Sequence, residues 1–281
     1  MSPALIANRR EAGFALVAVL LAAGFLAMLA ATMARAAHTE GAVTRTLGLA
    51  ATARAAADGA VRATIFALLT DQDAVLPRDG SLRQQAIGGV RVALSIQDET
   101  GLVDLNSAAP ELLAALFTAE SGAPPLAAAL TSEVLRRRPR PATGEAAPPR
   151  AGASFRSVSE LAAIGGMPVA LFHRLASLTT VNSRQAGIDP QTAPRSVLLA
   201  LPGAEPSAVE SFLGVRAEYR TAARQLLPQS ARFFAEGPHD VVRIAARAEA
   251  GGVVAERSAS VRLLRGARPP FLILDWQPGR S

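Results

Sequence analysis

The longest apolar stretch of the chain lies close to its N-terminus. Residues 14–34 carry no charged side chain, and they are flanked by Arg9, Arg10 and Glu11 on one side and by Arg35 on the other. A helix of about 20 apolar residues is long enough to cross the hydrocarbon core of a bilayer. Two arginines in front of such a helix favour a cytoplasmic N-terminus. The pattern therefore predicts a single-pass membrane anchor that places the rest of the chain outside the cytoplasm.

The apolar run has a sharp front edge. A polar, basic leader ends at Gly13, and the hydrophobic residues begin at once with Phe14. A secretory signal peptide would have a shorter apolar core followed by a cleavage site of the small-x-small type. Residues 31–36 form only a poor version of such a site. Cleavage after Gly13 is therefore the preferred interpretation, and an uncleaved signal anchor is the alternative.

Behind the anchor, the helix is predicted to continue. No proline occurs from residue 4 to residue 76, and Ala and Leu dominate this stretch. Both features favour an uninterrupted helix, which we expect to end near Leu69. At about 1.5 Å per residue, this helix would be a stalk roughly 80 Å long.

Alternation of apolar and polar residues with period two predicts β-strands on either side of a different, central region. Residues 89–97 place aliphatic side chains on one face of such a strand, namely Val90, Val92, Leu94 and Ile96. Residues 241–249 and 253–264 repeat the pattern, and Gly251-Gly252 between them indicates a hairpin. The apolar run 271–276 is interpreted as an edge strand. Together these segments predict a small antiparallel sheet.

The central region contains an internal repeat. Residues 104–116 and 189–201 both begin with Asp and both place a hydroxyl residue, Ser107 or Thr192, ahead of a proline and an apolar run. Ser and Thr are common N-caps, and proline is common in the first turn of a helix. The pattern therefore predicts that Ser107 and Thr192 each cap a helix.

Two segments of this region are predicted to form helix–turn–helix units. The second repeat continues through Leu201-Pro202-Gly203 into an apolar segment that ends at Glu218. Ser157 and Glu160 have the spacing of a capping box, and a Gly-rich turn and a second apolar segment follow, up to Leu178. Such hairpins resemble helix-hairpin-helix motifs, which bind DNA phosphates through amides at a helix N-terminus.

Charge and composition disfavour the nucleic-acid interpretation of these hairpins. Half of the 281 residues are hydrophobic and the net charge is +6, which favours packed domains over disorder. All 29 basic residues are arginine, and their densest run, residues 136–140, lies in a Pro-rich segment, 136–153, that is interpreted as a flexible, solvated loop. A nucleic-acid surface would concentrate charge on one element. Packing or partner recognition is therefore the preferred role of the helical hairpins.

The side chains of the usual catalytic sites are scarce. The chain has no Cys, which excludes disulfides and thiolate metal sites. Its three histidines, His38, His173 and His239, are scattered, which argues against a zinc site or a catalytic triad. No nucleophile with an adjacent base is recognisable. We therefore expect that the protein is not an enzyme.

Over nearly its whole length the chain resembles general secretion pathway protein K, the family of large minor pseudopilins of type II secretion. The step at Gly13/Phe14 is similar to the prepilin cleavage site. Most pilins carry Glu five residues after the cut, and the K-type subunit does not; here that position is Ala18. Further matching segments, in the same order, are residues 97–108, 160–167, 179–181 and 193–203, and the closing Trp276.

The resemblance implies a fold, a maturation step and a set of partners. The fold is α+β, with a pilin-like long N-terminal helix packed on a small antiparallel sheet and an inserted all-α domain that contains helix-hairpin-helix-like units. A prepilin peptidase would cut after Gly13 and methylate the new N-terminus, Phe14. Assembly would take place at the inner membrane, on the secretion platform, with I- and J-type minor pseudopilins. The body would lie in the periplasm and the subunit at the pseudopilus tip.

These expectations divide the chain into segments. They are the leader 1–13, the membrane helix 14–34, its periplasmic continuation 35–70, the α+β body 71–104 and 231–281, and the inserted α-helical domain 105–230 with the loop 136–153.

The resemblance also raises the question of a cofactor, since some family members bind calcium, which takes several oxygen ligands from one loop. The densest acidic groups of the chain are candidates, although ordinary solvated turns explain them equally well: Asp71, Asp73, Asp79, Asp98, Glu99 and Asp104.

Two other functions are compatible with a membrane-anchored pilin-like chain. A minor pilin of a type IV pilus would share the leader and the helix, but large tip adhesins of that class generally carry disulfides and extra β domains. A membrane-anchored DNA-binding protein would use the helical hairpins and should bind duplex DNA in a salt-dependent manner. Secretion is the preferred hypothesis.

Overall fold

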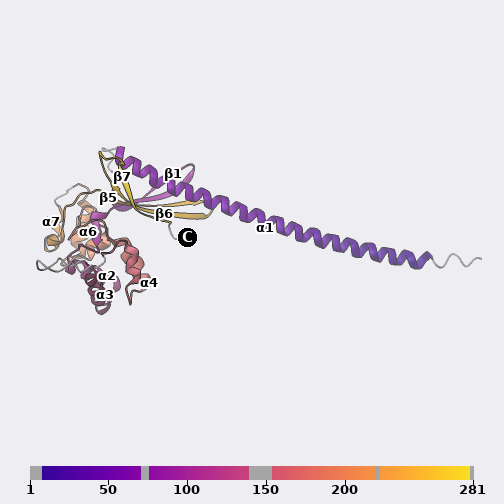
Figure 1. Cartoon of the computed structure of the whole chain (residues 1–281), viewed down its shortest axis with the longest axis horizontal. Helices are drawn as coiled ribbons and strands as arrows, with labels where there is room; N and C mark the ends of the chain where they lie inside the picture. The colour runs from indigo at the N-terminus through magenta and orange to yellow at the C-terminus, as the bar shows by residue number, and fades with distance from the viewer. Residues whose placement is uncertain (1–7, 71–75, 139–153, 219–221, 279–281) are drawn as a thin grey trace, which may run out of the picture.

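The computed structural model describes residues 8–70, 76–138, 154–218 and 222–278. Helix α1 (Asn8–Thr70) is 63 residues long, so the prediction that it ends near Leu69 is confirmed. Figure 1 shows its first part extending away from the rest of the chain and its last turns lying along the sheet. Within the first part, Leu16–Met33 has a mean hydropathy of 2.4 and is fully exposed in the isolated chain. Length and composition allow this segment to cross a membrane.

One antiparallel sheet forms the body, with the strand order β1-β2-β5-β6-β7. The strands are β1 (Asp79–Ile87), β2 (Val90–Asp98), β5 (Val241–Ala250), β6 (Val253–Leu263) and β7 (Phe271–Pro278). The predicted strands, the hairpin at Gly251-Gly252 and the edge position of β7 are confirmed. Strand β1 was not predicted, because its mostly polar and largely exposed residues lack the alternation of a half-buried strand.

The C-terminal half of α1 covers one face of this sheet. In β2, the alternate residues Val92, Leu94 and Ile96 are buried, and they lie opposite buried residues of β5 in the register. On α1, Ala53, Ala57 and Ala60 are fully buried. The small side chains let the helix backbone approach the sheet closely, and each buried Val, Leu or Ile contributes about 1.5–3 kcal/mol. The core of the body is therefore built from α1, β2, β5 and β6.

The helical region is inserted between β2 and β5, which are neighbours in the sheet. Its α-helices are α2 (Pro110–Ser121), α3 (Pro124–Arg137), α4 (Val169–Leu178), α5 (Arg195–Leu199), α6 (Pro206–Val215) and α7 (Ala222–Leu226). Its 3₁₀ helices are η1 (Glu99–Gly101), η2 (Val158–Ala163) and η3 (Pro228–Phe233), and a parallel pair is formed by β3 (Val103–Asp104) and β4 (Thr179–Thr180). The region has a hydrophobic cluster of its own, separate from that of the body.

The predicted caps of the internal repeat are wrong. The N-caps of α2 and α5 are Ala109 and Pro194, and neither makes a side-chain cap hydrogen bond. Ser107 and Thr192 lie before these caps, in turns that the first residue of each repeat organises. A carboxylate is a stronger acceptor for backbone N–H groups than a hydroxyl. The side chains of Asp104 and Asp189, and not those of Ser107 and Thr192, therefore accept the backbone hydrogen bonds of these turns.

Two other local predictions are corrected. Arg136 and Arg137 form the last turn of α3 and Arg138 is its C-cap, so the loop predicted at 136–153 begins later; residues 139–153 lie outside the described residues. Arg138 is held in place because its guanidinium donates to Leu105 O (2.8 Å) and Ala108 O (2.7 Å). The segment after Ser157 is a 3₁₀ helix rather than an α-helix, and Glu160 accepts from Arg156 N instead of closing the box at Ser157.

Candidate functional site

The apolar span of α1 is the first candidate functional element. Ala18 lies in α1 within the span Leu16–Met33 and is exposed, as is the rest of the span. Gly13 and Phe14 belong to the same helix, and the side chain of Phe14 is outside the part of the chain that the structure describes. An uncharged Ala18 removes the need for a partner that a carboxylate in a bilayer would have.

Where the inserted region meets the sheet, a group of mostly buried polar side chains lies between the two hydrophobic clusters. We call this group the polar junction, and it consists of Asp98, Glu99, Thr100, Asp104, Thr180, Asp189, His239, Arg243 and Ser260. Buried polar groups require partners, since an unpaired one costs about 1–3 kcal/mol. The contacts of the junction therefore determine how the two parts of the chain are joined.

Glu99 is the centre of the junction and is fully buried. Its Oε1 accepts a hydrogen bond from Ser260 of β6 (2.6 Å) and lies 3.7 Å from Arg243 Nε of β5. Its Oε2 accepts from Thr180 of β4 and from Asn182 Nδ2 (2.9 Å). One carboxylate thus binds two strands of the body and one strand of the inserted region.

Arg243 reinforces the same connection from the side of the sheet. Its guanidinium donates to two main-chain carbonyls at the end of α4, Ala176 O (3.0 Å) and Thr179 O (2.9 Å). The C-terminal end of a helix carries partial negative charge on its free carbonyls, which favours a cation there. Arg243 therefore holds α4 against β5 while it balances the charge of Glu99.

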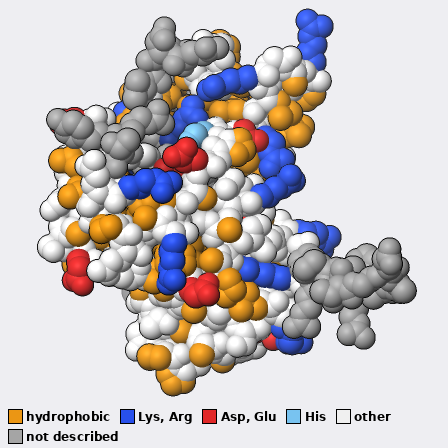
Figure 2. Space-filling view, turned by 90° about the vertical axis from the view of Figure 1, so that its left-hand side faces the viewer, with side chains coloured by type: hydrophobic (Ala, Val, Ile, Leu, Met, Phe, Trp, Pro, Cys, Tyr) orange, Lys and Arg blue, Asp and Glu red, His pale blue; other side chains and the backbone are white. Residues whose placement is uncertain are grey.

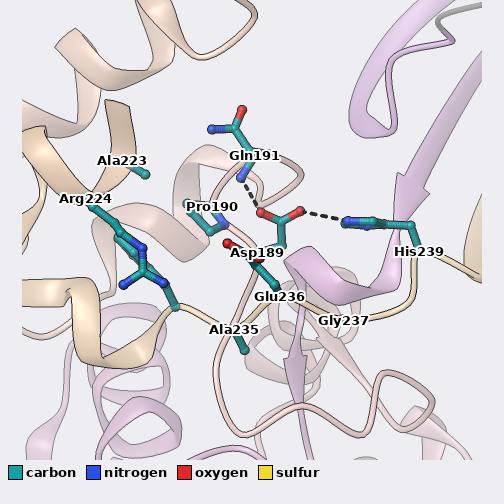
Figure 3. Close-up of a pocket in the computed structure, with 10 residues that line it drawn as sticks. Asp189, Pro190, Gln191, Ala223, Arg224, Ala235, Glu236, Gly237 and His239 are labelled. Atoms are coloured by element: carbon teal, nitrogen blue, oxygen red, sulfur yellow. Dashed lines mark hydrogen bonds and ion pairs between the residues drawn. The ribbon is translucent and has the colours of Figure 1, made fainter. Parts of the chain in front are cut away.

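Asp98 and His239 form the other side of the junction. Asp98 Oδ1 accepts from Thr100 N (3.0 Å) and Thr100 Oγ1 (2.7 Å), and its Oδ2 lies 3.0 Å from His239 Nδ1. Figure 3 shows the ring of His239 pointing toward Asp189 of the inserted region, whose Oδ2 is 3.6 Å from Nε2, at the edge of a cleft of about 440 Å³. The hydrogen bond to Asp98 and the charges of Asp98 and Asp189 raise the pKa of His239, although burial and Arg78 oppose this.

Asp104 organises the start of the inserted region and is fully buried. Its Oδ1 accepts from Asn106 N (2.8 Å) and Ser107 N (3.0 Å), and its Oδ2 accepts from Arg184 N (2.9 Å) and Ser183 Oγ (3.2 Å). The carboxylate thereby ties two loops that are far apart in the sequence.

The remaining calcium candidates are placed as follows. Asp71 and Asp73 lie outside the described residues. Asp79 forms an ion pair with Arg216; burial raises its pKa, but the hydrogen bonds from Ser81 and the Arg216 pair outweigh burial, and the pKa is lowered overall. In the part of the chain that the structure describes, no group of three or more His, Asp or Glu side chains is arranged to hold a metal ion.

Most surface arginines of the inserted region form ion pairs with carboxylates and do not form a basic cluster. Figure 2 shows basic side chains spread over the face that looks away from the free part of α1, among hydrophobic and acidic side chains. Ion pairs of this region join Arg137 to Glu133, Arg174 to Glu120 and Arg195 to Glu210. Charge that is already neutralised within the chain contributes little to phosphate binding. The arrangement thus gives no support to the DNA-binding hypothesis.

An apolar groove runs between the end of α1 and the edge strand β7. Its lining includes Leu69, Phe271 and Trp276, and its volume is about 390 Å³. Phe66 of α1 is 68% exposed beside it, and Ile273 of β7 is 49% exposed. Exposed apolar surface of this kind is typical of protein–protein contacts.

Three of the acidic calcium candidates lie in the polar junction. Asp98, Glu99 and Asp104 were predicted as carboxylates that could hold an ion, whereas the structure surrounds them with donors of the chain itself. Arg243 and Ser260 were not predicted. A signal in the sequence could have identified them. Both residues alternate with the buried hydrophobic residues of their strands and so lie on the opposite face of the sheet, where side chains can contact the inserted region.

Comparison with family models and with curated proteins gave no match. Five chains of solved structures match. One belongs to the crystal structure of the GspK-GspI-GspJ complex from the enterotoxigenic Escherichia coli type 2 secretion system, with a TM-score of 0.53 and 13% sequence identity, over 87% of this chain and 99% of that chain. At this identity the match is evidence of fold, and the α+β arrangement that the resemblance implied is confirmed. The chain therefore has the fold of a chain from the GspK-GspI-GspJ complex.

Proposed function

We propose that this protein is a minor pseudopilin of a type II secretion system that acts at the pseudopilus tip and supports protein export across the outer membrane. The observation that carries the proposal is a fold match that covers 99% of a chain from the GspK-GspI-GspJ complex. The present protein also has an N-terminal apolar helix that is long enough to span a membrane. The role is structural and not enzymatic. The anchor lies in the inner membrane and the body in the periplasm.

The proposal includes a division of the chain. Residues 1–13 are the leader, 14–34 the membrane part of α1, and 35–70 its periplasmic continuation. The body comprises residues 71–104 and 231–281, and the inserted domain, residues 105–230, meets it at the polar junction. Support for the last boundary comes from the two separate hydrophobic clusters. Prepilin peptidase acts on the leader, and the secretion platform of the inner membrane receives the mature subunit.

Processing provides a first prediction. If a peptidase cuts after Gly13, the mature chain should begin at Phe14, and mass spectrometry of the purified membrane form should show the loss of residues 1–13. Gly13→Val should block the shortening, because a branched side chain obstructs the approach of the peptidase to the scissile bond. Gly24→Val is the matched control, since an added Cβ at Gly24 meets no other atom of the chain. A mature chain that retains Met1, or that begins beyond Ala34, would show that this is not a prepilin.

Ala18 supports a position at the tip. In a pilin-like fibre, a subunit that is added beneath another pairs its glutamate with the N-terminal ammonium of the subunit above. This pairing offsets the cost of a carboxylate in lipid, about 2.5–3.5 kcal/mol on insertion scales. With Ala18 the subunit has an N-terminus to offer to the next one, but no carboxylate with which to bind one above. It should therefore be the first subunit of the fibre.

The test of the proposed function uses the full-length chain produced together with the I- and J-type minor pseudopilins of the same system. We expect the three to co-purify from detergent as one complex, and an epitope tag on this chain to label fibre ends in electron microscopy. Ala18→Glu supplies the missing carboxylate and should allow label along the shaft. Shaft labelling by the unchanged chain would overturn the tip position, and failure to co-purify would overturn the assignment to secretion.

A further inference from the structure

His239 lies between one carboxylate of the body and one of the inserted region. Its Nδ1 is 3.0 Å from Oδ2 of Asp98, the last residue of β2, and its Nε2 is 3.6 Å from Oδ2 of Asp189, the first residue of the second repeat. Figure 3 shows the ring aimed across the cleft at Asp189. The side chain is 38% exposed, so solvent protons reach it, whereas Asp98 is fully buried.

We propose that His239 is a protonation-dependent latch, which in its charged form holds the loop of Asp189 against the sheet body and releases that loop when it loses its proton. The latch concerns the joint between the two parts of the chain and does not depend on the proposed function.

The arrangement of acceptors around the ring favours the charged form. A neutral imidazole has one N–H donor and one lone pair, whereas an imidazolium has two donors. A neutral ring that donates from Nδ1 to Asp98 turns its Nε2 lone pair toward the carboxylate of Asp189. A neutral ring that donates from Nε2 leaves Nδ1 facing Asp98 and Thr100 Oγ1, which is 3.2 Å away and already donates to Asp98. Asp98 cannot turn away, because Thr100 N and Thr100 Oγ1 hold its other oxygen. Loss of the proton therefore weakens the contact with Asp189 first.

Other charged groups around the ring set the balance. Arg78 approaches from the segment before β1 and donates to His239 O (3.3 Å), and the pair Asp79–Arg216 lines the neighbouring cleft with Asp98. Glu236 and Arg224 line the cleft of about 440 Å³ on the other side. Arg216 is already paired with Asp79. Of the charged groups around the ring, Asp98 and Asp189 raise the pKa of His239 and Arg78 lowers it.

The direction of the pH effect follows from the raised pKa of His239. A group whose pKa is higher in the folded protein stabilises it fully below the ordinary imidazole value of about 6.5, and the stabilisation is lost as the pH rises through the folded-state value. The latch is thus closed in mildly acidic solution and opens on the alkaline side. The Glu99 contacts, which contain no histidine, keep α4 attached to the sheet in both conditions.

The latch can be tested with spin labels on the full-length chain in detergent micelles, since the sequence has no Cys of its own. One label replaces Leu82, which is 76% exposed on β1, and the other replaces Ser207, which is exposed at the start of α6. We expect a narrow distance distribution at pH 5.5 and a broader one at pH 8.5. In His239→Gln the distribution should be the same at both pH values, whereas the control His173→Gln should keep the pH dependence.

A second measurement keeps the latch testable if His239→Gln folds poorly. Histidine-selective NMR of the full-length chain should place the titration midpoint of His239 above about 6.5. Asp189→Asn removes the charge opposite Nε2 and should move this midpoint down toward the ordinary value. A midpoint at or below the ordinary value, or label distances that do not change with pH in the unchanged chain, would overturn the latch.

Discussion

Replacement of Glu99 by Gln should destabilise the protein by about 3–5 kcal/mol, because breaking a buried ion pair leaves the other charge uncompensated. The substitution keeps the volume of the side chain and removes its charge. Arg243, whose side chain is 18% exposed, would then lie at the sheet without a counter-charge. The amide would also present N–H donors to hydroxyl groups of Ser260 or Thr180 that donate to Glu99 in the native protein.

Denaturant unfolding of the full-length chain in detergent measures this loss. Trp276 is the only tryptophan and lies in β7, so its fluorescence reports on the body. The matched control is Glu256→Gln, which makes the same chemical change in an exposed pair with Arg247 and should cost no more than about 1 kcal/mol. Equal shifts of the unfolding midpoint in the two variants would show that Glu99 does not hold the parts together.

The elements that sequence reasoning found are those encoded by local pattern. The long N-terminal helix, the alternating strands and the Gly251-Gly252 hairpin each depend on neighbours within a few residues, and each is present. Strand β1 was missed because it is an edge strand whose residues are mostly polar, so that pairing with β2, and not burial, makes it a strand. Pairing between segments is not visible in the composition of one of them.

The polar junction was missed for a related reason. The residues that meet Glu99 come from positions 180, 182, 243 and 260, and no spacing rule connects them. A cluster of carboxylates in a sequence is compatible with an ion, a solvated turn or a buried network, and the choice depends on which donors the fold brings to it. The internal repeat was recognisable, but the role of its aspartates became clear only when the N–H groups around them were located.

Replacement of Asp104 by Ala should destabilise the protein by about 4 kcal/mol, and replacement of Asp189 by about 1–2 kcal/mol. The internal repeat makes the two a matched pair, since each Asp begins its own copy. Asp104 is fully buried and accepts from three backbone N–H groups and one hydroxyl. Unsatisfied buried groups cost about 1–3 kcal/mol each, and partial relaxation recovers some of that.

Asp189 has a different set of partners. It accepts from Gln191 N (2.9 Å), and its other oxygen faces Thr192 Oγ1 and the ring of His239, which is partly exposed. Water can replace part of the hydrogen bonding that the substitution of Asp189 by Ala removes, whereas no solvent reaches Asp104.

Unfolding of both variants, followed by circular dichroism of the helical signal, measures the difference. Equal losses of unfolding free energy would mean that the two repeats contribute equally to the stability of the inserted domain. They would also mean that the contact of Asp104 with the distant loop at Arg184 adds nothing to stability. We expect the first repeat to dominate, because only its carboxylate joins two loops that are 80 residues apart.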